Sequence, residues 1–346
     1  MRVLILGGSW FLGSAITAVA VHRGHHVTLF NRGISQCSVS TATRICGDWE
    51  RKSDVDRLAS AGPWDVAIDV AGVIPRLVGH CAKVLAPLVD RYVFVSTISV
   101  YMDWPHKPVD ENSPLWEDAD PECDPGTRAW DPDAYGPLKV GCEMAIRQQF
   151  GTERVSIVRP HVVLGPGEYV GRLPWWLSRT ARGGRVLVPA PDRSIQPIDV
   201  RDVAAFVVDR AQAATCAVFN VAAPAGRETF SGLFDACRAA TGSDAVPLWV
   251  DEDWLIARGV SQWTELPMWR ALPTAWSMVT DRAQAEGLRC RPLSDTVNDT
   301  WAWMCSGNRA VEHQRAGEHG ITAERERSLL VEWDRLRRSG CGVPSS

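Results

Sequence analysis

The N-terminal half of the chain alternates short apolar, β-branched runs with segments of helical spacing such as 14–23 and 141–150. Strands that are apolar throughout, rather than at every second residue, are typical of a parallel sheet covered by helices on both faces. The pattern therefore predicts an α/β fold with a doubly wound parallel sheet. Its strands are expected at Val3–Leu6, Val27–Phe30, Val66–Val70, Tyr92–Ser96 and Ser156–Arg159.

The 346 residues suffice for a large core domain and a smaller second one. After about Gly165 the sequence becomes rich in Trp, Leu and Pro, while the strand-like run Ala217–Ala222 returns to the main sheet. The acidic, proline-rich stretch 110–132 has no period and is expected as a surface loop, either a lid or an ordinary solvated loop. We predict a first domain over 1–164 with 190–222 returning to it, a smaller C-terminal α/β domain from 165–189 and 223–310, and a helical tail over 311–346.

Charge and cysteine content argue against several classes of protein. The formal net charge of −4 offers no basic footprint, so no nucleic-acid partner is expected. The cysteines form no closely spaced pair, which suggests thiols in a reducing compartment and no metal site. Met1-Arg2 leads straight into an apolar strand without the regions of a signal peptide, and no apolar run reaches membrane-spanning length. We therefore expect a cytoplasmic protein that does not contact a membrane.

The first strand is followed directly by a glycine-rich turn and then by a helix. At such a junction the backbone N–H groups and the positive end of the helix dipole bind the pyrophosphate of a dinucleotide. A G-x-x-G-x-x-G spacing would place glycine at position 10, where this chain has Trp10, so Gly8 is expected to allow the close approach instead. The turn reads Gly7-Gly8-Ser9-Trp10-Phe11-Leu12-Gly13.

The end of the second strand bears on the choice of cofactor. A carboxylate there binds the ribose 2′-hydroxyl of NAD, whereas an arginine without that carboxylate suits the 2′-phosphate of NADP. This strand ends in Asn31-Arg32. We therefore favour NADP(H), with NAD(H) as the alternative. Two weaker candidates for contact with the same dinucleotide are Gly47-Asp48, near the adenine, and Val70-Ala71-Gly72, beside the pyrophosphate.

A Tyr-x-x-x-Lys pair, Tyr135 and Lys139, lies where a helix is predicted. Residues four apart share one helix face, so the ammonium is expected near the phenol and would lower the phenol pKa from about 10. Pro137 fits the first helical turn, which Asp131 or Asp133 can cap. A tyrosine tuned in this way can give or take a proton.

The strand that precedes this helix ends in hydroxyl residues, Ser96-Thr97-Ile98-Ser99. Ligands of parallel sheets bind beyond the carboxyl ends of the strands, where a hydroxyl can hydrogen-bond a carbonyl or alcohol oxygen. Taken singly, each hydroxyl could equally cap a turn. Its position before the Tyr-x-x-x-Lys pair favours a role in chemistry.

In this order the motifs resemble the extended branch of the short-chain dehydrogenase/reductase superfamily, the NAD-dependent epimerase/dehydratase family. The resemblance covers roughly residues 1–303 and implies a Rossmann-type domain for the dinucleotide and a C-terminal substrate-binding domain. It rests on GGSWFLG (7–13), GDW (47–49), DVAG (69–72), VFVSTISVY (93–101), YGPLK (135–139), VRPHVVLGPG (158–167) and IQPIDVRDVA (195–204).

The resemblance also implies roles for individual residues. Tyr135 is the expected acid/base, Lys139 binds the nicotinamide ribose, and Thr97 orients the reacting oxygen, with Ser96 and Ser99 as second choices. NADPH would deliver hydride to a carbonyl or iminium carbon while Tyr135 protonates the oxyanion. The segment that enters the nicotinamide and substrate region is Arg159-Pro160-His161-Val162.

Three functions compete. The first is a reductase of a small organic substrate, in secondary metabolism, favoured by Asn31-Arg32 and a tryptophan-rich second half. The second is a nucleotide-sugar epimerase with retained NAD; dehydration is disfavoured because Ile98-Ser99 replace the usual Asp-Glu pair. The third is a non-catalytic cofactor-sensing or RNA-associated relative, against which the intact Tyr-Lys pair and the net charge argue. A homodimer is expected by analogy alone.

Overall fold

The computed structural model describes residues 1–34, 41–126 and 131–338. Its internal contacts divide the chain into two compact units. The first comprises Met1–Val163, Ile198–Ala223 and Met278–Cys290; the second comprises Leu164–Pro197, Pro224–Ser277 and the chain from Arg291 onward. The structure thus groups residues 278–290 with the first unit, whereas the sequence assigned them to the second domain. It groups the C-terminal helix with the second unit, whereas the sequence assigned that helix to a separate tail. The predicted domain limits stay a prediction.

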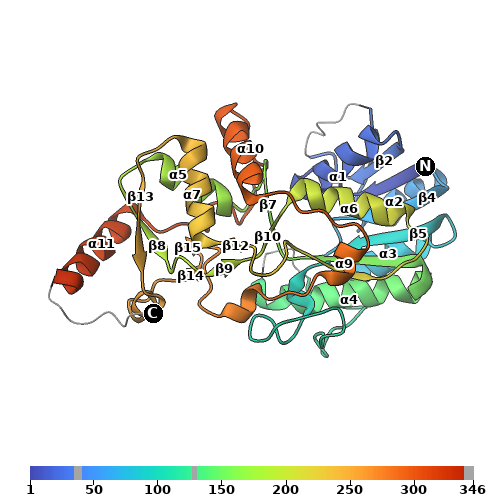
Figure 1. The fold of residues 1–346 in the computed structure, drawn as a ribbon. Coiled ribbons are helices and arrows are strands. Elements are labelled where there is room, and N and C mark those ends of the chain that lie inside the picture. Colours follow the sequence, from blue (N-terminus) through green and yellow to red (C-terminus); the bar gives the residue numbers. More distant parts are fainter. Residues whose placement is uncertain (35–40, 127–130, 339–346) are drawn as a thin grey trace. The chain divides into compact units, whose positions relative to one another are not determined.

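The first unit is built on a seven-stranded sheet in the order β11-β6-β5-β4-β1-β2-β3 (Figure 1). Neighbouring strands pair in parallel throughout this sheet. The predicted doubly wound parallel α/β sheet is therefore confirmed. The strands are β1 (Arg2–Leu6), β2 (His26–Asn31), β3 (Thr43–Cys46), β4 (Trp64–Asp69), β5 (Val89–Val95), β6 (Val155–Pro160) and β11 (Val218–Val221).

Both faces of this sheet are buried, which explains why its central strands contain runs of consecutive apolar residues. Along β1, Val3 and Ile5 belong to one core cluster, whereas Leu4 and Leu6 belong to another. The first cluster contains side chains of α1 (Phe11–His22) and α6 (Val200–Gln212). The second contains side chains of α2 (Lys52–Ser60), α3 (Pro75–Leu85) and α4 (Pro132–Phe150). The remaining elements of this unit are η1 (Ile98–Val100), η2 (Thr152–Arg154) and α9 (Asp281–Ala285).

The second unit combines short strand pairs with helices. β8 (Arg185–Pro189) pairs in parallel with β13 (Val246–Val250), and β9 (Ser194–Ile195) pairs antiparallel with β12 (Glu228–Thr229). α7 (Phe230–Thr241) packs against α5 (Arg172–Ala181) and α10 (Leu293–Cys305). The other elements are β14 (Gln262–Trp263), β15 (Leu266–Pro267), α8 (Glu252–Ala257), η3 (Pro273–Trp276) and α11 (Ala323–Arg338). β7 (Val162–Leu164) pairs with β10 (Pro197–Asp199), and both strands lie where the chain passes from one unit to the other.

A buried ion pair anchors α11. Arg179 Nε donates to both carboxylate oxygens of Glu326, at 2.9 and 2.7 Å, and Glu326 also accepts from the Leu187 backbone N–H. Thr322 caps the helix by accepting from Arg325 N. Within the described ranges, no helix is long and apolar enough to cross a membrane.

His319 is a buried histidine of the second unit. Its Nδ1 lies 3.0 Å from the Trp263 carbonyl oxygen, and its Nε2 is buried without a hydrogen-bond partner within the described ranges. Burial, and then the charges of Arg172 and Arg315, lower the pKa of His319 from 6.5 to about 4.

The unfolded chain therefore binds a proton at His319 between pH 6.5 and 4 that the folded chain does not bind, so stability falls on acidification. We expect a loss of about 1–2 kcal/mol across this interval, after allowance for solvent screening. Urea unfolding at stepped pH measures it, with His319→Gln as the comparison. Equal pH slopes for the two proteins would contradict this assignment.

Candidate active site

The glycine-rich turn is locked onto α1. Gly7 and Gly8 have φ values of 101° and 83°, a left-handed region that favours glycine. A Cβ at Gly13 would lie 2.8 Å from the Gly8 backbone nitrogen, so this helix can approach the turn only with glycine there. Thr17 Oγ1 lies within hydrogen-bond distance of the Gly8 and Gly13 carbonyl oxygens. The turn is therefore a rigid backbone cradle at the carboxyl end of β1.

Trp10 occupies the N-cap position of α1. Its backbone is extended, with φ of −103°, so position 10 requires no glycine for its conformation. The Trp10 side chain provides no capping hydrogen bond, and no acidic residue lies in the first turn of the helix. The helix start is thus electrostatically suited to a phosphate despite the missing glycine.

Asn31 holds the turn from the end of β2. Its Nδ2 donates to the Gly7 carbonyl oxygen at 3.0 Å, and its Oδ1 accepts from Gly33 N at 3.0 Å. The sequence indicated a cofactor contact for Asn31 but not this positioning role. Arg32 beside it is exposed and has no partner within the described ranges. An exposed guanidinium therefore lies next to the cradle.

Gly47-Asp48, at the end of β3, are brought to the same edge of the sheet. Gly47 N donates to the Asn31 carbonyl oxygen at 2.9 Å, and a Cβ at Gly47 would lie 2.5 Å from the Phe30 ring. Asp48 Oδ1 accepts from Glu50 N at 3.1 Å. The predicted adenine segment is thus adjacent to the β2 end that carries Arg32.

Asp69 organises the Val70-Ala71-Gly72 loop. Its fully buried carboxylate accepts from the backbone N–H groups of Ala71 and Gly72, both at 2.9 Å, and from Tyr92 Oη at 3.0 Å. Burial raises the pKa of Asp69, an effect that Lys139 and these donors oppose. Sequence analysis missed this residue, although an acid at the end of an otherwise apolar strand was the available signal.

Lys139 is buried at the ends of β4 and β5. Its Nζ donates to the carbonyl oxygens of Gly72 and Val95, both at 2.8 Å, and lies 3.9 Å from the centroid of the Phe94 ring. Burial lowers its pKa, while neighbouring acidic groups, among them Asp69, act in the opposite direction. An ammonium has three donors, and within the described ranges no acceptor binds the third. The group is therefore held in place with one donor left for a ligand.

Tyr135 lies in the first turns of α4, the helix that also carries Lys139. Asp131 caps this helix by accepting from Asp133 N at 2.9 Å and Ala134 N at 3.4 Å. Tyr135 is half-buried. The next residue, Gly136, packs so closely on the chain after β5 that a Cβ would overlap the Ser99 carbonyl oxygen. Glycine at position 136 thus lets the helical turn that carries Tyr135 approach residues 96–99, which follow β5.

The hydroxyls after β5 point to different partners. Thr97 Oγ1 accepts from Ser99 N at 3.2 Å and caps η1. Ser96 Oγ donates to Glu143 Oε1 at 2.5 Å in the interior. Ser96, offered by the sequence as a second choice for binding the reacting oxygen, is used within the protein, and the Thr97 hydroxyl donates to Ser99 Oγ at 3.4 Å at the turn.

The stretch after Tyr101 is docked, not an ordinary solvated loop. Trp116 Nε1 donates to the Ser99 carbonyl oxygen at 2.8 Å, and a Cβ at Gly141 would lie 2.6 Å from the Asp120 carbonyl oxygen. Glu111 accepts from the Asn220 backbone N–H at 3.0 Å. The described part of this segment therefore packs against α4 and η1 and supports the turn that carries Thr97.

Arg159, expected near the nicotinamide, is instead used internally. Its guanidinium binds Glu143 and donates to Tyr101 Oη at 3.0 Å, and the residue is buried. Pro160 ends β6, and the His161 ring lies 5.8 Å from the Trp104 ring in an edge-on arrangement. Val162 begins β7. The charged side chain of this segment, that of Arg159, thus binds groups inside the protein and not a ligand.

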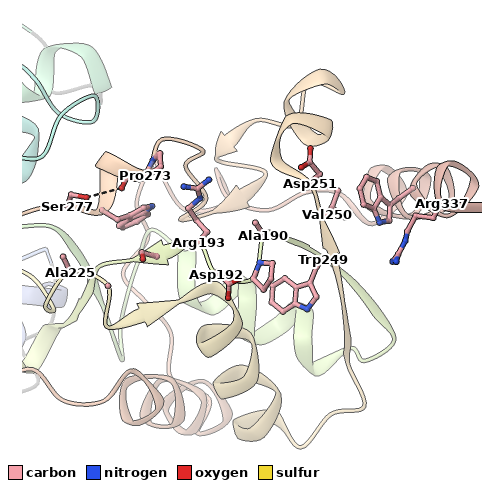
Figure 2. Close-up of a pocket in the computed structure, with 15 residues that line it drawn as sticks. Ala190, Asp192, Arg193, Ala225, Trp249, Val250, Asp251, Pro273, Ser277 and Arg337 are labelled. Carbon is pink, nitrogen blue, oxygen red and sulfur yellow. Dashed lines mark hydrogen bonds between the residues drawn. The ribbon is translucent and has the colours of Figure 1, made fainter. Parts of the chain in front are cut away.

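The second unit contains a pocket of 790 Å³ (Figure 2). Its lining includes Arg193, Trp249, Asp251, Trp276 and Arg337. Arg193 is bound by Glu252, which also accepts from Trp269 Nε1 at 2.8 Å. None of the residues predicted for the site lines this pocket. Within the described ranges, no group of three or more His, Cys, Asp or Glu could hold a metal ion.

Comparison with known proteins gives one curated relative. The chloroplast stem-loop binding protein of 41 kDa b from Arabidopsis thaliana is 29% identical over 260 residues, which make up 70% of this chain and 63% of the relative. The matching part thus spans less than two thirds of that relative's length. No family model matches the chain.

Solved structures resemble almost the whole chain. UDP-glucose 4-epimerase from Thermotoga maritima, with UDP-glucose, has a TM-score of 0.65 at 17% identity and covers 89% of this chain and 99% of its own. The Bordetella bronchiseptica enzyme WbmG, in complex with NAD, has a TM-score of 0.64 at 18% identity, with 93% and 96% covered. Likeness at these identities establishes the fold alone, and it agrees with the α/β fold that the sequence predicted.

Proposed function

Since the chain has the fold of the extended short-chain dehydrogenase/reductases, we propose that it is an NAD(P)H-dependent reductase of a carbonyl or iminium group on a small organic substrate. One observation carries the proposal. Lys139 is buried and fixed by two backbone carbonyls, with one donor left, on the helix that carries Tyr135. Burying an ammonium costs free energy, so its presence here favours a role in ligand binding or chemistry.

The residues around the turn fit a dinucleotide. The cradle of Gly7, Gly8 and Gly13 would hold the pyrophosphate, because its backbone conformation and its close packing against α1 both require glycine and leave the N–H groups at the helix start for a ligand. Lys139 would bind the nicotinamide ribose, and the segment 70–72 would flank the phosphates. When bound, the cofactor supplies a hydride to an electrophilic carbon.

The protein's own groups account for the proton. Thr97 would donate a hydrogen bond to the substrate oxygen and orient it beside Tyr135. As the carbon accepts hydride, the oxygen gains charge, and Tyr135 Oη gives it a proton, so that an alcohol forms. The positive charge of Lys139 stabilises the phenolate that remains. The docked segment with Trp116 supports the turn that carries Thr97.

Arg32 favours NADP(H) over NAD(H), because its exposed guanidinium lies at the end of β2. Replacing Arg32 by Ala is expected to weaken NADPH binding about 10- to 100-fold, the effect of losing one charge-assisted hydrogen-bonding partner, and to leave NADH binding unchanged. Fluorescence titration of both nucleotides measures it. Arg51→Ala, another exposed arginine of the first unit, is the control. Equal losses for NADPH and NADH would overturn the preference.

A nucleotide-sugar epimerase with retained NAD is the second enzymatic candidate, favoured by the epimerase among the structural neighbours. Mass spectrometry of the small molecule released on denaturation separates the two. Retained NAD with slow exchange supports the epimerase, whereas an empty site that prefers NADPH supports the reductase and directs a screen of carbonyl substrates.

Nucleic-acid binding is a further candidate because of the name of the curated relative. The net charge of −4 argues against a strong electrostatic contribution. Gel-shift titration with a stem-loop RNA at stepped salt concentration tests it. Binding that persists in Tyr135→Phe and is lost with salt would establish an activity independent of the catalytic residues.

A further inference from the structure

A row of polar side chains runs along one face of α4. Tyr135, Lys139 and Glu143 are spaced four residues apart and so lie one above the other. Tyr135 is half-buried, whereas Lys139 and Glu143 are only 3% and 1% exposed. Glu143, which the proposed mechanism does not use, ends the row inside the protein.

The two buried members of the row bind consecutive residues at the end of β5. Lys139 Nζ donates to the Val95 carbonyl oxygen at 2.8 Å, and Glu143 Oε1 accepts from Ser96 Oγ at 2.5 Å. Thr97 is the next residue. Helix α4 therefore fixes the chain immediately before Thr97 at two points.

Arg159 extends this attachment to the other side of Thr97. Its Nε and Nη2 donate to the two oxygens of Glu143, at 3.0 and 2.5 Å. Its Nη1 donates to Tyr101 Oη at 3.0 Å, and the guanidinium lies 5.0 Å from the centroid of the Tyr101 ring. Ser96 and Tyr101, which flank Thr97 and η1, are thus bound to one ion pair.

Stability alone does not account for this pair. Both side chains are 2% exposed, and the cost of removing two charges from water offsets much of their attraction. Apolar side chains of similar size would stabilise such a core equally well. They could not accept from the Ser96 hydroxyl or donate to the Tyr101 hydroxyl, which itself donates to Asn220 Oδ1 at 2.7 Å.

We propose that Glu143, held by Arg159, is the positioning residue for Thr97. Through Ser96 and Tyr101 it fixes the Thr97 hydroxyl relative to Tyr135, which lies on the same helix as Glu143. The effect of this role on catalysis rests on the proposed reductase function. How firmly segment 96–101 is held can be measured by hydrogen exchange without substrate or cofactor.

The test compares Glu143→Gln and Ser96→Ala with Glu326→Gln, which alters the buried pair that Glu326 forms with Arg179 in the second unit. Hydrogen exchange, followed by mass spectrometry of peptides covering 96–101, is expected to be roughly tenfold faster in the first two variants and unchanged in the control. In NADPH-dependent turnover, the first two are expected to lower kcat about 10- to 100-fold with an unchanged KM for NADPH.

The two readouts separate the failure of this inference from the failure of the proposed function. Unchanged exchange at 96–101 in both Glu143→Gln and Ser96→Ala overturns the positioning role, whatever the turnover. Faster exchange spread evenly over the chain also overturns it, because that result marks a general loss of stability. Locally faster exchange in a wild-type protein that reduces no substrate keeps the positioning role and removes the reductase. If Glu143→Gln does not fold, Ser96→Ala decides.

Discussion

Replacing Tyr135 by Phe is expected to lower NADPH-dependent turnover by roughly 10²- to 10⁴-fold, the usual contribution of a general acid. The substitution removes only the hydroxyl that gives the proton, and the ring keeps its half-buried place in the first turns of α4. Cofactor binding should therefore be unchanged. Steady-state kinetics together with NADPH titration distinguish loss of chemistry from loss of binding.

Tyr169→Phe is the matched control, since Tyr169 is also half-buried but lies in the second unit, where its ring packs against His313. It should retain full turnover. If Tyr135→Phe turns over as fast as the wild type, Tyr135 is not the acid, and the non-catalytic candidates gain the support that the reductase loses.

Replacing Gly136 by Ala is expected to lower the free energy of unfolding by about 3 kcal/mol or more, because a backbone overlap cannot relax by rotating a side chain. The added Cβ would overlap the Ser99 carbonyl oxygen and lie 2.5 Å from Trp116 Nε1. The hydrogen bond between these two groups would break, and α4 would move away from the Thr97 turn. Urea unfolding measures the loss, and turnover should fall with it.

Gly232→Ala provides the comparison, as Gly232 is also a helical glycine near a helix start, in α7. Its nearest neighbour to an added Cβ is Thr229 Oγ1 at 3.5 Å, an ordinary contact. There alanine should stabilise by about 0.5–1 kcal/mol through its helix propensity. A Gly136→Ala protein as stable as Gly232→Ala would show that the helix and the turn do not touch as described.

The central sheet could be predicted because its strands are buried on both faces. The run Val3–Leu6 is apolar at every position, and Val66–Val70 is apolar except at Asp69, a pattern that strongly favours a buried strand. β3 was missed since its sequence, Thr-Arg-Ile-Cys, lies at the edge of the sheet with no fully buried residue. This segment is a strand because it pairs with β2, and the local sequence contains no pattern that indicates the pairing.

The candidate site was predictable where backbone conformation demands a residue type, as at Gly7 and Gly8, or where spacing places residues on one helix face, as at Tyr135 and Lys139. It was not predictable where a side chain turns inward. Arg159 and Ser96 have the chemistry of ligand-binding residues, but each binds Glu143 instead. Both side chains point inward because they bind Glu143, which is buried on α4. The spacing of motifs in the sequence does not show such a contact between distant segments.

The chain passes back and forth between its two units, and this has an evolutionary consequence. A fragment ending at residue 163 would lack β11 and α6, whose Val203, Phe206 and Val207 lie in one core cluster with β1. Recombination of a single continuous stretch of gene therefore cannot exchange one unit and spare the other. New ligand preferences therefore arise mainly through point substitutions and loop insertions. The loops of related proteins should diverge long before their overall architecture does.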